Sequence, residues 1–219
     1  MKMNNKMKSI LTAATLLGAC AFSSAAMAAA CTGVSIGTSS TADVKLGGDA
    51  SDKCVVSTAN PQAGRNGTTS GFNSTFGVGG WSLLSKVTGS SVTAAHSSAS
   101  FGGVDYKIDF TENAGTAKTG TWTITANKAV TLDLVFAVHA SNRSDAFFFD
   151  DQVLAKNAAS AGSWTINWLN NGRQVPDFSN LTIFARDTRV SAVPEADTYA
   201  MLLAGLGLVG FVARRRRAK

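Results

Sequence analysis

The chain has 219 residues, of which 16% are charged and 21 are glycine. This length suits one domain of ordinary size, and the low charge excludes a coiled coil or a long helical bundle. The formal net charge of +6 lies entirely at the two ends, because residues 1–28 and 194–219 carry +3 each and residues 29–193 hold 12 basic and 12 acidic side chains. A central segment without net positive charge lacks the basic surface that binds a phosphate backbone, so we expect no nucleic-acid partner.

The N-terminus has the pattern of a secretory signal peptide over residues 1–28. Three lysines precede an apolar stretch over 10–22, and the small residues that follow contain an A-x-A cleavage site at Ala26 and Ala28. The apolar stretch is shorter than the roughly 20 residues that span a bilayer. One alternative stays open, because Cys20 ends a segment that resembles a bacterial lipobox, in which this cysteine would be lipidated.

Two cysteines, Cys31 and Cys54, remain once the signal peptide is removed. An even pair in an oxidising compartment predicts one disulfide, which would stabilise the fold by about 3 kcal/mol in the chain-entropy model. A metal site is the weaker reading, because neither cysteine has a histidine or a further cysteine nearby. We therefore expect residues 29–80 to form short strands and loops pinned by this disulfide.

Residues 104–110 alternate between apolar even positions and charged odd positions, which is typical of a half-buried strand. A period of two recurs in four later segments, and short clusters of Gly, Asn and Ser separate these runs. The later segments are 121–125, 130–138, 164–168 and 181–185. Strands at this spacing, without a helical pattern between them, predict an all-β antiparallel β-sandwich or jelly roll over residues 29–192. We expect a turn at residues 141–144.

Aspartates are the first candidates for chemistry. Asp105 and Asp109 share one strand face, while Asp150 and Asp151 follow three consecutive phenylalanines. Carboxylates brought together can bind Ca²⁺ or act as the acid and base of a glycosidase. Sequence spacing cannot place two carboxylates at the required separation, so we expect solvated strand faces and a turn.

The other candidate binding or catalytic residues have less support than the aspartates. His96 and His139 are the only histidines in the sequence, and neither has a second histidine or a cysteine at ligand spacing. Trp164 and Trp168 could stack on sugar rings, but the alternation of their segment assigns them to the core. The G-x-S-x-G match at residues 33–37 lacks the strand–turn–helix setting of a nucleophile elbow. We therefore predict no catalytic residue, no metal and no cofactor.

The C-terminus carries a second candidate targeting segment. An apolar segment over 199–213 predicts a transmembrane helix of about 22 Å, short for a hydrocarbon core of about 30 Å, and snorkelling arginines extend its effective span. The positive-inside rule keeps the arginines cytoplasmic and places residues 29–193 outside the inner membrane. The residues before the helix are Val193, Pro194, Glu195 and Ala196, and the basic block after it is Arg214, Arg215, Arg216 and Arg217.

This arrangement of Val-Pro-Glu, a short apolar helix and an arginine cluster resembles the PEP-CTERM protein-sorting signal. Proteins that carry it are exported by Gram-negative bacteria that make extracellular polysaccharide. The resemblance covers residues 193–219, with Pro194 and Glu195 at the first two motif positions and Ala196 in place of the usual second proline. It implies recognition by exosortase, a membrane-embedded transpeptidase-like enzyme that is thought to cut near the motif.

These features predict an exported, exosortase-sorted, non-catalytic protein of the cell envelope or extracellular matrix, with a structural or binding role. Extracellular polysaccharide is a candidate partner of the β domain. Two alternatives stay open: a polysaccharide-acting enzyme that uses paired aspartates, and a Ca²⁺-dependent carbohydrate-binding module.

Overall fold

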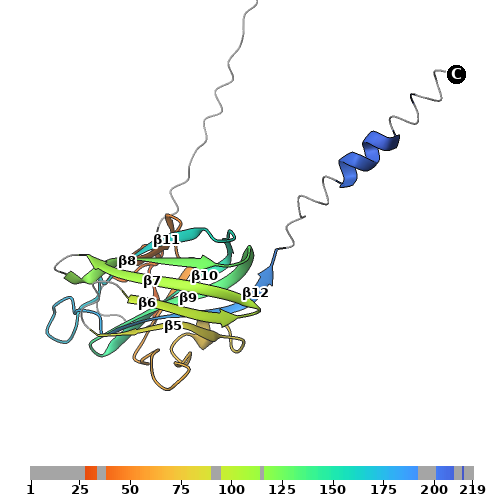
Figure 1. Ribbon diagram of the computed structural model, residues 1–219. Coiled ribbons are helices and arrows are strands. Elements are labelled where there is room, and N and C mark those ends of the chain that lie inside the picture. The colour runs from red at the N-terminus through yellow and green to blue at the C-terminus, as the bar shows by residue number, and fades with distance from the viewer. Residues whose placement is uncertain are drawn as a thin grey trace, which may run out of the picture.

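The computed structural model describes residues 28–33, 38–89, 95–113, 116–191, 201–209 and 214. Within these ranges, twelve strands form two six-stranded sheets that pack face to face (Figure 1). The predicted β-sandwich is confirmed.

The first sheet has the strand order β1-β4-β10-β9-β12-β5. In that order the strands are β1 (Thr32–Gly33), β4 (Lys53–Ser57), β10 (Arg143–Leu154), β9 (Val130–Ala140), β12 (Asn180–Val190) and β5 (Ser82–Thr88). β1 runs parallel to β4, and the other neighbours in this sheet are antiparallel.

The second sheet has the strand order β3-β2-β11-β8-β7-β6, and all its described pairs are antiparallel. In that order the strands are β3 (Asp49–Ala50), β2 (Val44–Leu46), β11 (Ala159–Thr165), β8 (Thr116–Ala126), β7 (Val104–Asn113) and β6 (Ala95–Phe101). A 3₁₀ helix, η1 (Thr41–Asp43), leads into β2. The sheets meet along one side, where Ser85 Oγ of β5 lies 2.6 Å from Ser97 Oγ of β6.

The main core lies between the sheets and is built from the inward-facing residues of the alternating strands. Tyr106, Ile108 and Trp122 of the second sheet are at most 1% exposed. Trp122 packs on Phe136 of the first sheet, with 5.0 Å between ring centroids. The period of two in β7 and β8 arises because the opposite face of these strands is directed to solvent.

A second apolar cluster covers the outer face of the first sheet. The segment 58–81, which includes the short helix α1 (Asn73–Phe76), brings Phe76 and Trp81 onto Phe148 of β10. Phe72 of the same segment packs on Phe184 of β12. The middle of the first sheet is therefore buried on both faces, unlike the second sheet.

The turn predicted at residues 141–144 is too long. β10 begins at Arg143, and residues 143–149 are all buried. Phe147 and Phe149 belong to the main core and Phe148 belongs to the outer cluster. A strand with two buried faces shows no alternation, so β10 is not among the strands that the sequence predicts. Its first two residues, Arg143 and Ser144, are polar and buried, and polar residues of this kind are typical of a turn.

The strand predicted at 164–168 is also corrected. β11 spans Ala159–Thr165, while Ile166 and Trp168 follow it as buried residues of the connection. The apolar residues at these positions alternate because they are buried, although the hydrogen-bonded strand has already ended.

Several predicted features lie outside the described residues. These are the signal peptide up to residue 27 with Cys20 and Ala26, residues 34–37 of the G-x-S-x-G match, the sorting residues 193–196, and Arg215, Arg216 and Arg217. Of the predicted helix over 199–213, residues 201–209 are described and are helical. Among the helices that the structure describes, none has the length and hydropathy needed to cross a membrane.

Candidate functional site

The disulfide predicted between Cys31 and Cys54 is formed, with 4.7 Å between the Cα atoms. It attaches β1 to β4 at the edge of the first sheet. The backbone before it is also fixed, because Thr41 receives a hydrogen bond from the Ala29 N–H at its Oγ1 and donates its own N–H to the Ala29 carbonyl. The N-terminal end of the described domain is therefore held by covalent and hydrogen bonds.

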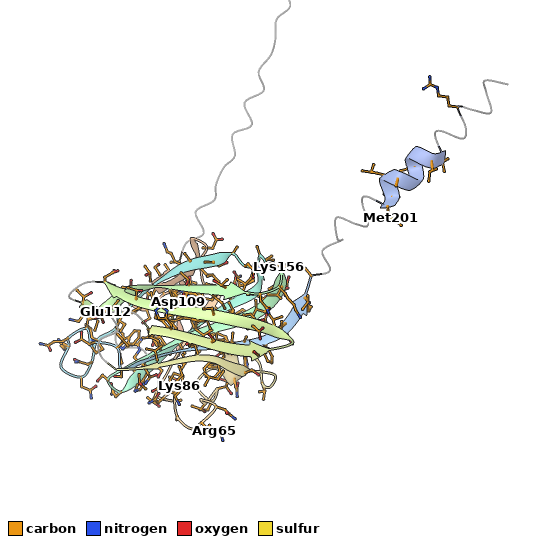
Figure 2. All side chains as sticks on the ribbon, in the orientation of Figure 1. Arg65, Lys86, Asp109, Glu112, Lys156 and Met201 are labelled. Atoms are coloured by element: carbon orange, nitrogen blue, oxygen red, sulfur yellow. A yellow bond between two sulfur atoms is a disulfide. The ribbon has the colours of Figure 1, made fainter. Side chains whose placement is uncertain are left out.

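Asp105 and Asp109 lie on the outward face of β7, as the alternation predicts. Asp105 accepts hydrogen bonds from Ser100 Oγ and from Asn127 Nδ2 at 2.7 Å. Asp109, labelled in Figure 2, pairs with His96 and with Lys107. Burial raises the pKa of Asp109, but hydrogen bonds from His96 and Lys107 outweigh it and hold the pKa below its ordinary value.

His139 lies beside a serine, and this arrangement resembles the histidine–serine pair of a catalytic site. Its Nδ1 lies 2.7 Å from Ser144 Oγ, and that hydroxyl donates to the Ala59 carbonyl at 2.6 Å. Burial lowers the pKa of His139, which suits a general base. Ser144 is only 3% exposed, so in this arrangement its hydroxyl links three chain segments and has no open approach for a substrate.

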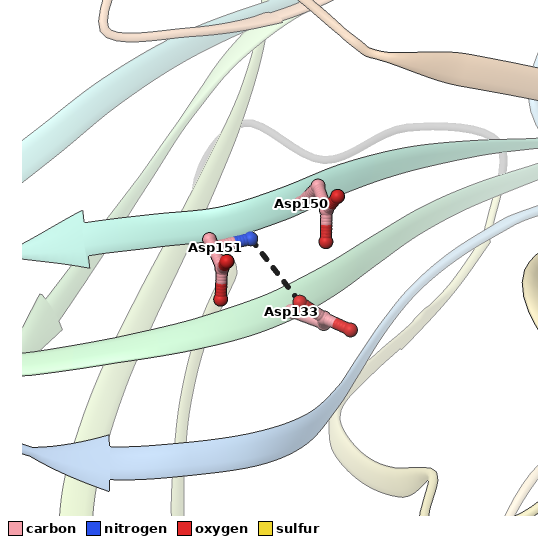
Figure 3. A group of neighbouring side chains, drawn as sticks. All are labelled: Asp133, Asp150 and Asp151. Carbon is pink, nitrogen blue, oxygen red and sulfur yellow. Dashed lines mark hydrogen bonds between the residues drawn. The ribbon is translucent and has the colours of Figure 1, made fainter.

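Asp133, Asp150 and Asp151 gather on the first sheet, with one carboxylate oxygen of each within 4.8 Å of the others (Figure 3). They come together because β10 has a bulge between Phe149 and Gln152, opposite Asp133 of β9. Two aspartates of β10 thus oppose one residue of β9, and Asp151 adopts a φ of 46°. Its N–H donates to Asp133 Oδ1 at 3.1 Å, the dashed line in Figure 3.

Two arginines of β12 partly neutralise these carboxylates. Arg186 Nε donates to Asp133 Oδ2 at 2.9 Å, and its guanidinium lies 4.2 Å from the Trp81 ring. Arg189 pairs with Asp151. β12 has its own bulge between these two arginines, and the resulting hollow of about 500 Å³ is lined by Asp133, Asp150, Asp151, Asp187, Thr188 and Arg189.

Asp150 is the carboxylate of this group that is least compensated. Burial raises its pKa, and the neighbouring charges of Asp133, Asp151 and Asp52 raise it further. Three such oxygen donors are the type that Ca²⁺ prefers. A cation here would compete with Arg186 and Arg189 for the same oxygens.

The structure therefore divides the four predicted aspartates between two sheets. Asp105 and Asp109 face outward from β7, whereas Asp150 and Asp151 join Asp133 on the first sheet. Asp133 was not a candidate from the sequence, because it meets Asp150 and Asp151 only through the bulge in β10. No glycine or turn motif in the sequence indicates that bulge. Trp164 and Trp168 are at most 1% exposed, so they belong to the core.

Comparison with known proteins identifies a sorting motif at the C-terminus. The family model described as the PEP-CTERM protein-sorting motif matches residues 192–217. No curated protein and no solved structure matches the chain significantly.

The match at 192–217 overlaps the segment 193–219 whose arrangement resembles this motif. It indicates a protein that is exported, processed by exosortase and delivered to the cell envelope or the extracellular space. The match begins at residue 192, two residues after β12 ends at Val190, so the motif directly follows the last strand of the sandwich. The chain is a β-sandwich protein that carries the PEP-CTERM sorting motif of exosortase substrates.

Proposed function

We propose that the exported β-sandwich is non-catalytic and has a structural or binding role in the cell envelope or extracellular matrix. The observation that supports this most strongly is that the four predicted aspartates are divided between two sheets. A glycosidase needs two carboxyl groups facing each other about 5–10 Å apart across one bond. Asp105 and Asp109 are engaged with neighbours on the second sheet. On the first sheet, Asp133 is paired with Arg186 and Asp151 with Arg189.

The buried pair of His139 and Ser144 supports the same proposal. A nucleophile must reach the substrate, and the Ser144 hydroxyl is enclosed and donates to a backbone carbonyl. Its hydrogen bonds hold the β9–β10 hairpin to residue Ala59. This is a structural use of residue types that elsewhere perform acyl transfer.

Incubation of the purified protein with its host's polysaccharide tests the absence of catalysis. We expect no new reducing ends above a protein-free blank. Release of reducing ends by the wild-type protein, with loss of that activity in Asp150→Asn or Asp109→Asn, would instead show an enzyme. Lys118→Ala, at a distant surface ion pair with Asp177, is the control for nonspecific effects.

Deletion of residues 193–219 tests the sorting half of the proposal. The truncated protein keeps every described strand, so it should fold and be exported but should not be retained or processed like the full chain. Delivery of the truncated protein to the same location, in the same processed form, would contradict a sorting role for the tail.

A Ca²⁺-dependent carbohydrate-binding module is a second candidate, favoured by the three carboxylates around Asp133. Titration of the protein with CaCl₂ in a calorimeter, before and after addition of the host's polysaccharide, tests it. Saturable heat that disappears in Asp133→Asn supports this candidate. Absence of heat, or heat unchanged in that variant, removes it.

A further inference from the structure

A hollow of about 390 Å³ opens at one end of the sandwich, apart from the carboxylate groups. Three segments meet there: residues 56–58 at the end of β4, residues 142–143 at the β9–β10 turn, and residues 169 and 171 in the connection after β11. Its volume falls within the range of small-molecule sites, about 300–1,000 Å³. None of the candidate residues discussed for catalysis lines it.

The charge within this hollow is internally compensated. Arg143 lines it, but its guanidinium donates to Asp145 at 2.8 and 3.0 Å and to Ser39 Oγ at 2.7 Å. Asp145 is fully buried, and the guanidinium also lies 5.1 Å from the Trp168 ring. A ligand in the hollow therefore meets a neutral ion pair, which gives no counter-charge to an anion or a cation.

The remaining lining residues combine short polar groups with an apolar surface. Asn142 and Asn171 each offer an amide donor and acceptor, and Thr58 offers a hydroxyl. Val56 and Leu169 supply aliphatic surface in the same hollow. The complementary ligand has hydroxyl groups around a ring whose faces carry C–H groups, as a neutral sugar has.

The backbone that carries these polar side chains is held by turns, so little backbone ordering is required on binding. Asn142 follows Ser141, whose φ of 60° makes the tight β9–β10 turn. Asn171 lies in a turn closed by two hydrogen bonds, from the Asn170 N–H to the Gln174 carbonyl at 2.9 Å and from the Gln174 N–H to Asn170 Oδ1 at 3.0 Å.

We propose that this hollow binds one residue of a neutral glycan, through the amides of Asn142 and Asn171 and the aliphatic surface of Leu169. The inference rests on the proposed binding role of the domain and names its site and ligand class. It is independent of calcium, because the carboxylate cluster at Asp133 lines a different hollow.

Titration of the oxidised full-length protein in detergent with glucose, galactose, mannose and N-acetylglucosamine tests the site, with glucuronate as the charged counterpart. At least one neutral sugar should bind with a Kd of about 10 mM or tighter, and the double variant Asn142→Ala/Asn171→Ala should weaken it by about 10-fold or more. Thr58→Trp should block binding by filling the hollow from an exposed position. Ser98→Ala, in a separate hollow on the second sheet, should bind normally.

The inference fails if none of the four sugars binds, if glucuronate binds as tightly as glucose, or if binding survives both the double variant and Thr58→Trp. Far-UV circular dichroism and a melting curve show whether each variant is folded. Co-sedimentation with the host's matrix separates this failure from that of the proposed function. Equal co-sedimentation of wild type and Thr58→Trp overturns the site alone, whereas wild-type protein found free of both envelope and matrix overturns the proposed function.

Discussion

Arg143 and Asp145 form an ion pair that is nearly inaccessible to solvent, with side chains 9% and 0% exposed. Burial raises the pKa of Asp145, and the hydrogen bonds from Arg143 and Ser39 oppose that rise. A buried ion pair adds little to the stability of the fold compared with apolar residues of similar volume. Loss of one partner, however, leaves the other as an unpaired buried charge. The two residues therefore have to be retained or replaced together.

Arg143→Ala should lower the free energy of unfolding by about 3–5 kcal/mol, because Asp145 would remain buried without its cation. Urea denaturation of the oxidised protein measures this loss. The double variant Arg143→Met/Asp145→Leu is the matched control and should lose clearly less. A single variant that loses under about 1 kcal/mol would show that Asp145 is compensated in another way.

Asp150→Asn should stabilise the protein at neutral pH. A raised pKa in the folded state means that Asp150 contributes favourably only while it is protonated, and that this contribution is lost as pH rises through the folded pKa. Asparagine avoids that loss, so we expect a gain of up to about 0.5 kcal/mol at pH 7, the usual range for an exposed substitution. The gain should disappear below about pH 3, where aspartate is protonated in both states.

Thermal melts at both pH values measure this difference. Asp49→Asn, an exposed position on β3 of the second sheet, is the control and should leave the melting temperature at pH 7 nearly unchanged. A variant at Asp150 that is less stable than wild type at pH 7 would show that the carboxylate is engaged favourably there.

At the scale of elements, a strand could be predicted from the sequence where apolar and polar residues alternate. β7 and β8 alternate because one of their faces is directed to solvent, and β9 was recognised through Thr131 and Asp133 although its middle is buried on both faces. β10 was not predicted, because segment 58–81 covers its outer face and nothing in a local window shows that cover. β6, with the sequence Ala-His-Ser-Ser-Ala-Ser-Phe, has a single large apolar residue at its end and was not predicted for that reason.

The same limit applies to the carboxylate cluster. Asp105 and Asp109 could be placed on one face because their strand is regular over that stretch. Asp133 could not be joined to Asp150 and Asp151, because their meeting depends on a bulge and on the register between β9 and β10. Register is a property of two distant segments, so a single-strand pattern does not determine it.

Close approach between β11 and its neighbours depends on Gly162. A Cβ atom at this position would lie 2.2 Å from the Lys45 carbonyl oxygen and 2.3 Å from Trp122 Nε1, which itself donates to that carbonyl. Gly162→Ala should therefore lower the free energy of unfolding by about 1–3 kcal/mol through overpacking. Denaturant titration measures it, with Ser160→Ala on the same strand as the control. Equal stability of the two variants would contradict the packing described here.

At the scale of the whole molecule, the β-sandwich and the sorting motif are adjacent in the chain but separable. The last strand, β12, pairs with β9 and β5 on its two sides, and the sorting motif starts two residues after it. Cleavage near the motif therefore leaves the sandwich intact. At the other end, the disulfide of Cys31 lies three residues beyond the predicted signal cleavage after Ala28. Both processing positions thus border the folded domain closely.

Mass spectrometry of the intact protein, isolated from the envelope and medium of its host, tests the central claim most directly. We expect a species that begins near Ala29, lacks Arg214, Arg215, Arg216 and Arg217, and contains the Cys31–Cys54 disulfide. The same protein from a host without exosortase should retain the arginines. A mature protein from the normal host that still ends in the four arginines, or that carries two free thiols, would contradict export and sorting by this route.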